Sequence, residues 1–164
     1  MPDLSQFVAA RVVALFSTRV AGTPLDARAD AVLEQGRGIV GDRYYLGVGT
    51  FSEMNRGKPD CEVTLIESEE IVRFNDAQGT TKPASDFRRN IVTKDIRLNE
   101  LVGKRFSVGA VLLEGIRLCE PCAHLARLVS PSVVDAMAHR AGLRARIVAG
   151  GTIRPGDPIR EHAD

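Results

Sequence analysis

The residues best suited to chemistry lie in the tetrapeptide Cys119-Glu120-Pro121-Cys122. Two thiols three positions apart can share a metal ion, form a disulfide, or divide the roles of nucleophile and resolving thiol. A structural zinc site is disfavoured, because it needs two further ligands, His124 is too close for the usual spacing, and the sequence has no second cysteine pair. A thioredoxin-like redox site ranks lower among the thiol chemistries, because that motif follows a strand of a βαβ unit, whereas this one follows a predicted hairpin.

The two cysteines are expected to differ in environment. Cys119 ends an apolar strand pattern, so we expect a small buried side chain, the common fate of a free cysteine. Cys122 stands at the predicted start of a helix, where the helix dipole favours a thiolate. We therefore expect Cys122 to be the reactive thiol, with His124 as a candidate proton partner. The patterns around His139 and His162 predict ordinary surface or core histidines.

Basic residues at two places are candidate anion ligands. The run Arg88-Arg89-Asn90 puts two guanidinium groups and an amide at a predicted strand start, which suits a phosphate or a carbonyl-rich heterocycle. Adjacent arginines are also common on solvated surfaces. The glycine-rich stretch 38–43 lacks the third glycine of a dinucleotide fingerprint and the lysine of a P-loop. Its last residue, Arg43, is either an anion ligand or a structural partner of Asp42.

Composition and charge exclude several classes of protein. The chain has 164 residues, of which 44% are hydrophobic and 26% charged, as expected of one folded domain over residues 1–164 with its core at about 10–161. The net charge is +1 and tryptophan is absent, so the sequence provides neither a basic field nor the stacking platforms for nucleic acid. No apolar segment predicts a leader or a membrane span. Three cysteines are unlike a secreted disulfide framework, so we expect a cytoplasmic protein.

Short strands separated by turn residues dominate the predicted secondary structure. Strands are predicted at 11–18, 30–35, 61–67, 87–93, 104–108, 111–119 and 143–149, with one more over 152–160. Helices are predicted at 68–75, 122–129 and 132–140, with a helical connector at 98–103. Many short strands with three small helices predict a mostly β fold, in which the strands form a barrel and the helices lie on its rim.

Several motifs occur together in a recognisable order: Gly38-Ile39-Val40-Gly41-Asp42-Arg43-Tyr44, Arg88-Arg89-Asn90-Ile91-Val92, Leu101-Val102-Gly103, Pro121-Cys122, Gly142-Leu143-Arg144-Ala145 and Gly151-Thr152-Ile153-Arg154-Pro155-Gly156-Asp157. In this order the chain resembles the MOSC domain, the C-terminal module of molybdenum cofactor sulfurases. The resemblance extends from about Val12 to Ile159. It implies a mostly β fold like the pyruvate kinase β-barrel domain.

The resemblance also implies a chemistry for particular residues. Members of the family bind a molybdopterin-type cofactor or carry sulfur, and relatives include the mitochondrial amidoxime reducing component and bacterial reducers of N-hydroxylated bases. By position, Cys122 matches the cysteine that ligates molybdenum or carries sulfur, and Arg88 and Asn90 match the Arg-x-Asn pair that contacts the cofactor. The other residues that the resemblance places at the cofactor are Arg43, Thr18 and Arg19.

Two functions follow as hypotheses. The first is a molybdenum cofactor-binding oxidoreductase that reduces small N-oxygenated compounds, with Cys122 as a metal ligand. The second is a sulfur carrier that holds a persulfide on Cys122, which Cys119 could resolve. The chain lacks the aminotransferase-like part of the sulfurases and the electron-transfer domain of some bacterial reductases, so we expect an electron-transfer protein or a cysteine desulfurase to act in trans. A third possibility is a domain that binds only a small anion.

Overall fold

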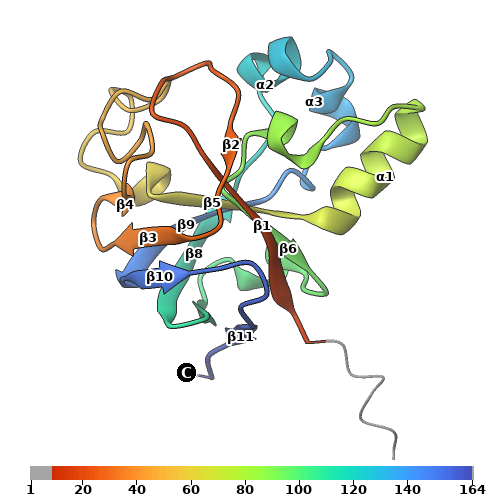
Figure 1. Ribbon diagram of the computed structural model, residues 1–164. Coiled ribbons are helices and arrows are strands. Elements are labelled where there is room, and N and C mark those ends of the chain that lie inside the picture. The colour runs from red at the N-terminus through yellow and green to blue at the C-terminus, as the bar shows by residue number, and fades with distance from the viewer. Residues whose placement is uncertain (1–8, 164) are drawn as a thin grey trace, which may run out of the picture.

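The computed structural model describes residues 9–163 and arranges them around one large and one small β-sheet (Figure 1). The strands are β1 (Arg11–Ser17), β2 (Asp26–Ala27), β3 (Ala31–Glu34), β4 (Gly38–Ile39), β5 (Val63–Glu67), β6 (Ile91–Lys94), β7 (Arg105–Val108), β8 (Val111–Leu118), β9 (Leu143–Ala149), β10 (Gly151–Ile153) and β11 (Ile159–Glu161). The eight-stranded sheet has the order β11-β7-β8-β9-β5-β6-β1-β2, and the three-stranded sheet has the order β10-β3-β4.

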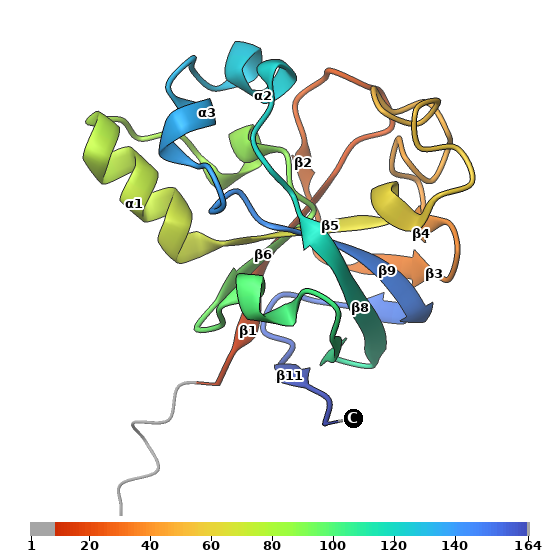
Figure 2. The ribbon, with the colours of Figure 1, turned by 180° about the vertical axis from the view of Figure 1, so that it is seen from behind.

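The helices lie together on one side of this arrangement. They are α1 (Ser68–Gln78), α2 (Ala123–Leu128) and α3 (Val133–Ala136), with the 3₁₀ helices η2 (Pro59–Cys61), η3 (Ala84–Phe87) and η4 (Leu98–Leu101). Figures 1 and 2 show α1, α2 and α3 gathered on one side and the small sheet on the other. Because α1 and η3 carry the chain from β5 to β6, these two strands can pair in parallel, whereas the other pairs of strands within residues 9–163 are antiparallel. No helix within residues 9–163 is long and apolar enough to cross a membrane.

Two apolar clusters fill the two faces of the large sheet. The first joins the sheets and includes Leu33, Leu65, Phe106 and Ile147, and the second lies under the helices and includes Ile66, Phe74, Phe87, Leu125 and Met137. Strand β5 contributes to both, because consecutive side chains of a strand point to opposite faces. The alternating sequence of β9 follows the same rule, with Leu143, Ala145 and Ile147 buried and its arginines half-buried.

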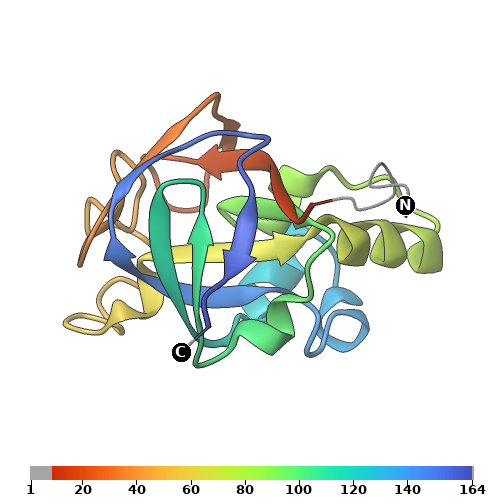
Figure 3. The ribbon, with the colours of Figure 1, turned by 90° about the horizontal axis from the view of Figure 1, so that it is seen from below.

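The large sheet is not closed into a barrel, so this part of the expected fold is wrong. Its edge strands are β2 and β11, and Figure 3 shows β11 beside the β7–β8 hairpin. An isolated bridge between Arg11 and Pro158 brings β1 next to the segment before β11. Hydrogen bonds lie on both sides of this bridge, from the Val12 N–H to the Asp157 carbonyl and from the Ile159 N–H to the Ala10 carbonyl, but Pro158 has no N–H to donate and the two segments form no regular ladder.

The predicted elements otherwise correspond closely to those observed. The expected three small helices are present, although α3 is shorter than predicted, because His139 adopts a left-handed conformation with φ of 61°. The strand expected at 87–93 begins at Ile91, because η3 occupies residues 84–87 and Arg88 is also left-handed, with φ of 63°. The two-residue strands β2 and β4 carry no sequence pattern and were not predicted. The expected absence of a leader falls on residues 1–8, which lie outside the described part of the chain.

Candidate functional site

A pocket lies between α2 and the long loop that follows β4. Loop residues Arg43, Tyr44, Thr50 and Phe51 form one side of it, and the remaining lining residues are Thr64, Arg88, Arg89, Cys119, Glu120, Cys122, His124, Leu125 and Arg144. The rings of Phe51 and His124 meet edge to face with centroids 5.9 Å apart, so they join the loop to α2. Segments from most of the chain therefore meet at this pocket.

Both cysteines of the tetrapeptide line the pocket, but they differ in exposure. Cys122 is the N-cap residue of α2 and is half-buried, whereas Cys119 is only 1% exposed. The backbone N–H of Cys119 donates to the carbonyl of Gly142 at 2.8 Å. The environments expected from the sequence are thus observed, and Cys122 is the more accessible thiol.

Arg43 is held in the pocket by its neighbour in sequence. Its Nη1 donates to Asp42 Oδ1 at 3.0 Å, and both side chains are buried. Asp42 also accepts hydrogen bonds from the backbone N–H groups of Thr18 and Tyr44. The guanidinium carbon of Arg43 lies 4.7 Å from the centre of the Tyr44 ring. The interpretation of Arg43 as a structural partner of Asp42 is therefore confirmed, whereas its role as an anion ligand stays a prediction.

Arg88 is buried, so its interpretation as a solvated surface arginine is wrong. It is 9% exposed, and its Nη1 donates to the carbonyl of Thr23 at 2.6 Å. No carboxylate of residues 9–163 forms an ion pair with it. Burial lowers the pKa of Arg88, and the positive charge of Arg43 lowers it further. The site therefore holds a cation that forms no ion pair within the described chain, although the charge of Asp42 acts on it and raises its pKa.

Asn90 lies behind the pocket wall. Its Oδ1 accepts hydrogen bonds from the backbone N–H and the Oγ1 of Thr64, both at 3.1 Å. Its Nδ2 donates to the carbonyl of Phe16 at 3.1 Å. The amide therefore joins β1 to β5 and positions Thr64, which lines the pocket. A direct contact of Asn90 with a cofactor stays a prediction.

Arg89 supports the cysteine segment. Its Nε donates to the carbonyl of Ala141 at 2.9 Å, and its Nη2 donates to the carbonyl of Cys119 at 3.0 Å. Both acceptors are backbone atoms, so this guanidinium group joins the residues before β9 to the start of the tetrapeptide.

Thr18 and Arg19 differ in their relation to the pocket. Thr18 is buried, its carbonyl accepts a hydrogen bond from the Arg43 backbone N–H at 2.7 Å, and its Oγ1 lies 2.8 Å from that of Thr23. Arg19 lines a different hollow, with Arg28 and Val40. The structure thus brings Cys122, Arg43 and Arg88 together, keeps Thr18 and Asn90 behind them, and separates Arg19 from the group.

Arg144 is a pocket residue that the sequence analysis did not single out. Its Nη1 donates to the carbonyl of Asp60 at 3.0 Å, while its Nε is buried without a hydrogen-bond partner among residues 9–163. The alternating pattern of β9 places Arg144 opposite the core face, which is a signal that the sequence contains. Its position in the same pocket as Arg88 depends on the fold, and no local sequence pattern indicates it.

His124 is the titratable group next to these arginines. Burial lowers the pKa of His124, and the charges of Arg88, Arg127 and Arg43 lower it further. The neutral imidazole is therefore favoured, as expected where positive charge accumulates. Within residues 9–163, no three His, Cys, Asp or Glu side chains are arranged to hold a metal ion by themselves.

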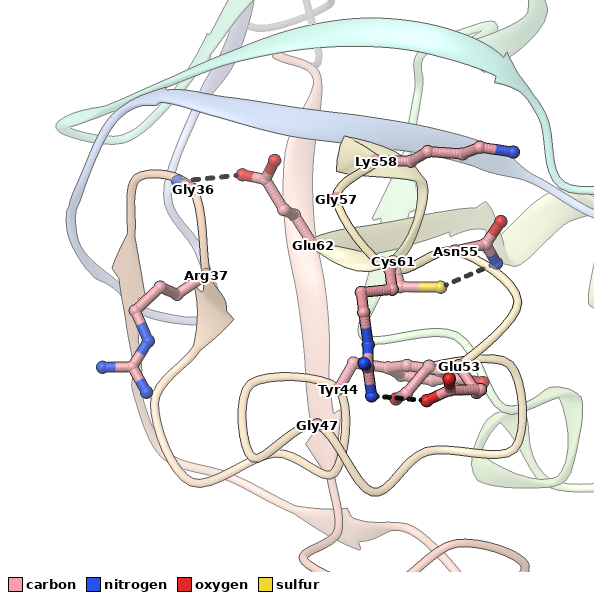
Figure 4. Close-up of a pocket in the computed structure, with 12 residues that line it drawn as sticks. Gly36, Arg37, Tyr44, Gly47, Glu53, Asn55, Gly57, Lys58, Cys61 and Glu62 are labelled. Carbon is pink, nitrogen blue, oxygen red and sulfur yellow. Dashed lines mark hydrogen bonds and ion pairs between the residues drawn. The ribbon is translucent and has the colours of Figure 1, made fainter.

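A second pocket shares Tyr44 with the first. Figure 4 shows its lining, in which Asn55 Nδ2 donates to the sulfur of Cys61 at 3.2 Å. Burial raises the pKa of the Cys61 thiol, although the Asn55 hydrogen bond opposes this effect. The third cysteine thus lies in a separate pocket, which shares Tyr44 with the pocket of Cys122.

The sequence model of the MOSC domain matches residues 52–160. The chain belongs to the MOSC domain family. The matched residues include Arg88, Asn90, Cys122 and Arg144, whereas Arg43 precedes them. The MOSC family is linked to molybdenum cofactor binding.

Solved structures agree with a MOSC fold. The YuaD protein from Bacillus subtilis is similar with a TM-score of 0.81 at 15% identity, over 96% of this chain and 97% of that one. YiiM from Geobacillus stearothermophilus is similar with a TM-score of 0.73 at 16% identity, over 94% of this chain and 75% of that one. YiiM from Escherichia coli is similar with a TM-score of 0.64 at 18% identity, over 94% of this chain and 70% of that one. No curated protein matches the MOSC chain in sequence.

Proposed function

We propose that the pocket around Cys122 binds a molybdopterin-type cofactor and that the protein is an oxidoreductase acting on small N-oxygenated compounds. The observation that carries the proposal is a half-buried thiol in one pocket with two guanidinium groups, of Arg88 and Arg144, that have no carboxylate partner among residues 9–163. The three free cysteines suit a reducing compartment, which supports the cytoplasm as its location.

The residues of the pocket fit such a cofactor. An unpaired charge in a low-dielectric site is costly, so buried arginines favour an anionic ligand. A phosphate dianion suits them, because a guanidinium group can donate two parallel hydrogen bonds to it. The Nε–H of Arg144, which is buried without an acceptor in the described chain, is a donor available to that anion. A cysteine thiolate is the soft ligand that a molybdenum centre accepts.

Each residue then has a distinct task. Arg43, Arg88 and Arg144 would bind the phosphate and the polar pterin, and the Sγ of Cys122 would hold the metal. The chemistry that a bound cofactor of this class supplies is two-electron removal of an oxygen atom from the substrate. The neutral His124 can take up a proton at a ring nitrogen when negative charge enters the pocket. Electrons would come from an electron-transfer protein in trans.

A sulfur carrier is the alternative function. It is favoured by the presence of Cys119 and Cys122 in the same pocket, where a second thiol could resolve a persulfide on Cys122. In this case the partner would be a cysteine desulfurase. The low exposure of Cys119 restricts its role to a reaction within the pocket.

Metal and pterin content test the first proposal. Protein purified from a host that makes molybdenum cofactor is assayed by mass spectrometry for metal and by fluorescence for oxidised pterin. We expect stoichiometric metal and pterin, lost in Cys122→Ala and nearly intact in Cys119→Ala. Equal loss in both variants would indicate a paired-thiol site. Absence of metal and pterin from wild type would contradict the proposal, and a persulfide detected on Cys122 would then support the carrier.

A further inference from the structure

The segment that carries Cys122 has no regular structure of its own. Residues 119–122, called here the thiol loop, connect β8 to α2, and the carbonyl of the last residue, Cys122, accepts a hydrogen bond from the Ala126 N–H at 2.9 Å. Its first residue is fixed by the two contacts described above, from Cys119 N–H to Gly142 and from Arg89 to the Cys119 carbonyl. A loop held in this way needs a further contact to keep the sulfur atom in one position, because a segment with few backbone hydrogen bonds can open locally.

That support comes from a pair of residues in the thiol loop and the turn before β9. The backbone N–H of His139 donates to Glu120 Oε1 at 2.7 Å, and His139 Nδ1 lies 2.7 Å from Glu120 Oε2. Both oxygens of the carboxylate are thus bound by one residue. On the other side of the turn, Asn99 Nδ2 donates to the His139 carbonyl at 2.8 Å, which ties the turn to η4.

Stability alone does not account for this pair. The His139 side chain is 77% exposed, and exposed ion pairs contribute little to folding free energy. His139 also adopts a left-handed backbone conformation, with φ of 61°, which is uncommon for a residue other than glycine. Its contact with a carboxylate two positions from Cys122 is better explained by the position that it gives to the thiol loop.

We propose that Glu120 and His139 are positioning residues for Cys122. Their contact joins the thiol loop to the turn before β9 and fixes the position of the Cys122 sulfur in the pocket that Arg88 and His124 also line. The proposal deepens the proposed function and rests on it for the purpose of the thiol, whether as metal ligand or as persulfide carrier. The position of the Cys122 sulfur itself is proposed for the cofactor-free chain.

The experiment measures the alkylation rate of each cysteine by iodoacetamide in the folded, cofactor-free protein, with fragment ions separating Cys119 from Cys122. The variants are Glu120→Ala, His139→Gly and His139→Asn. Glycine relieves the backbone strain but removes the side-chain donor, whereas the Nδ2 of asparagine occupies the branch position of His Nδ1 and asparagine tolerates the left-handed conformation. We expect Cys122 to react about three to ten times faster in Glu120→Ala and His139→Gly, because the loop opens more often, and at nearly the wild-type rate in His139→Asn.

Two controls separate positioning from general loosening. Cys61, in the neighbouring pocket, is an internal reference whose rate should not change in any variant. Glu161→Gln removes an exposed partner of Lys104, 3.1 Å away and remote from the pocket, and should leave Cys122 unaffected. Equal Cys122 rates in wild type, Glu120→Ala and His139→Gly would overturn the proposal, as would parallel increases at Cys61 and Cys122. The assay needs no bound cofactor, so its result is independent of whether the metal analysis supports the proposed function.

Discussion

Asn90 and Thr64 bind each other through both backbone and side-chain groups. The Asn90 backbone N–H donates to the carbonyl of Thr64 at 3.1 Å, and Asn90 Oδ1 accepts from the N–H and Oγ1 of Thr64. These contacts fix the relative position of β5 and the segment before β6. The Arg-x-Asn motif therefore contains one arginine that lines the pocket and one asparagine that holds the wall in place.

Replacing this asparagine should destabilise the fold. Asn90→Ala leaves the Thr64 N–H and the Phe16 carbonyl without their side-chain partner in a buried place, so we expect unfolding free energy to fall by about 2 to 4 kcal/mol. Urea denaturation followed by circular dichroism measures this change. A loss below about 1 kcal/mol would mean that water replaces the amide, and would contradict a structural role.

Arg88→Met should separate stability from binding. Methionine keeps much of the side-chain volume and removes a buried cation without a counter-ion, so unfolding free energy should stay equal or rise. Retention of pterin and metal should fall strongly. Thermal denaturation and pterin fluorescence measure the two effects, and Arg105→Met, at an exposed residue paired with Glu114, is the control for arginine loss. A large decrease in melting temperature would instead show that the Thr23 hydrogen bond makes Arg88 structural.

Gly49→Ala should disturb the pocket through Tyr44. A Cβ built at position 49 would lie 2.4 Å from Cε1 of the Tyr44 ring, so the ring must move away and lose its position beside Arg43. We expect weaker cofactor retention and a loss of stability of about 1 to 3 kcal/mol. Combining Gly49→Ala with Tyr44→Ala should recover most of the loss attributable to the clash, because the double variant has no ring to displace. Additive effects would show that the two residues act independently.

Anion binding should raise the pKa of His124. In the free protein, burial and the charges of Arg88, Arg127 and Arg43 lower the pKa of His124, because a protonated ring would add positive charge next to these arginines. A phosphate bound to the arginines cancels part of this charge and favours the imidazolium, so binding takes up a proton and strengthens as pH falls toward the pKa of the bound state. Proton NMR titration of the histidine ring signals, with and without inorganic phosphate, measures the shift. His162, outside the pocket, is the reference, and an unchanged His124 titration would argue against an anion at these arginines.

Most strands and helices could be predicted from the sequence, because the pattern that specifies each of them lies within its own segment. The alternating aliphatic residues of β9 and the Gly109-Ala110 corner between β7 and β8 specify strand and hairpin without reference to the rest of the chain. Barrel closure was wrongly expected, because it depends on the pairing of β1 with the far end of the chain, where Pro158 interrupts the ladder.

The site was partly predictable for the same reason. The positions of Cys122, Arg43 and Arg88 follow motifs, but the burial of Arg88 depends on a hydrogen bond to Thr23, 65 positions away. Arg144 lines the pocket because β9 pairs with β5. Arg19, which precedes β2, lines a different hollow. These outcomes depend on contacts between distant segments, which no single motif contains.

The place of β9 in the large sheet sets the order in which the pocket can be assembled during synthesis. This strand lies between β8 and β5, yet it is made after both of them. While the ribosome is still adding residues before 143, the sheet lacks a central strand, and Arg144 is not present to face Arg88. Because pairing of distant segments is slow, the pocket that Arg88 and Arg144 share cannot form until β9 has been made and has paired with β8 and β5.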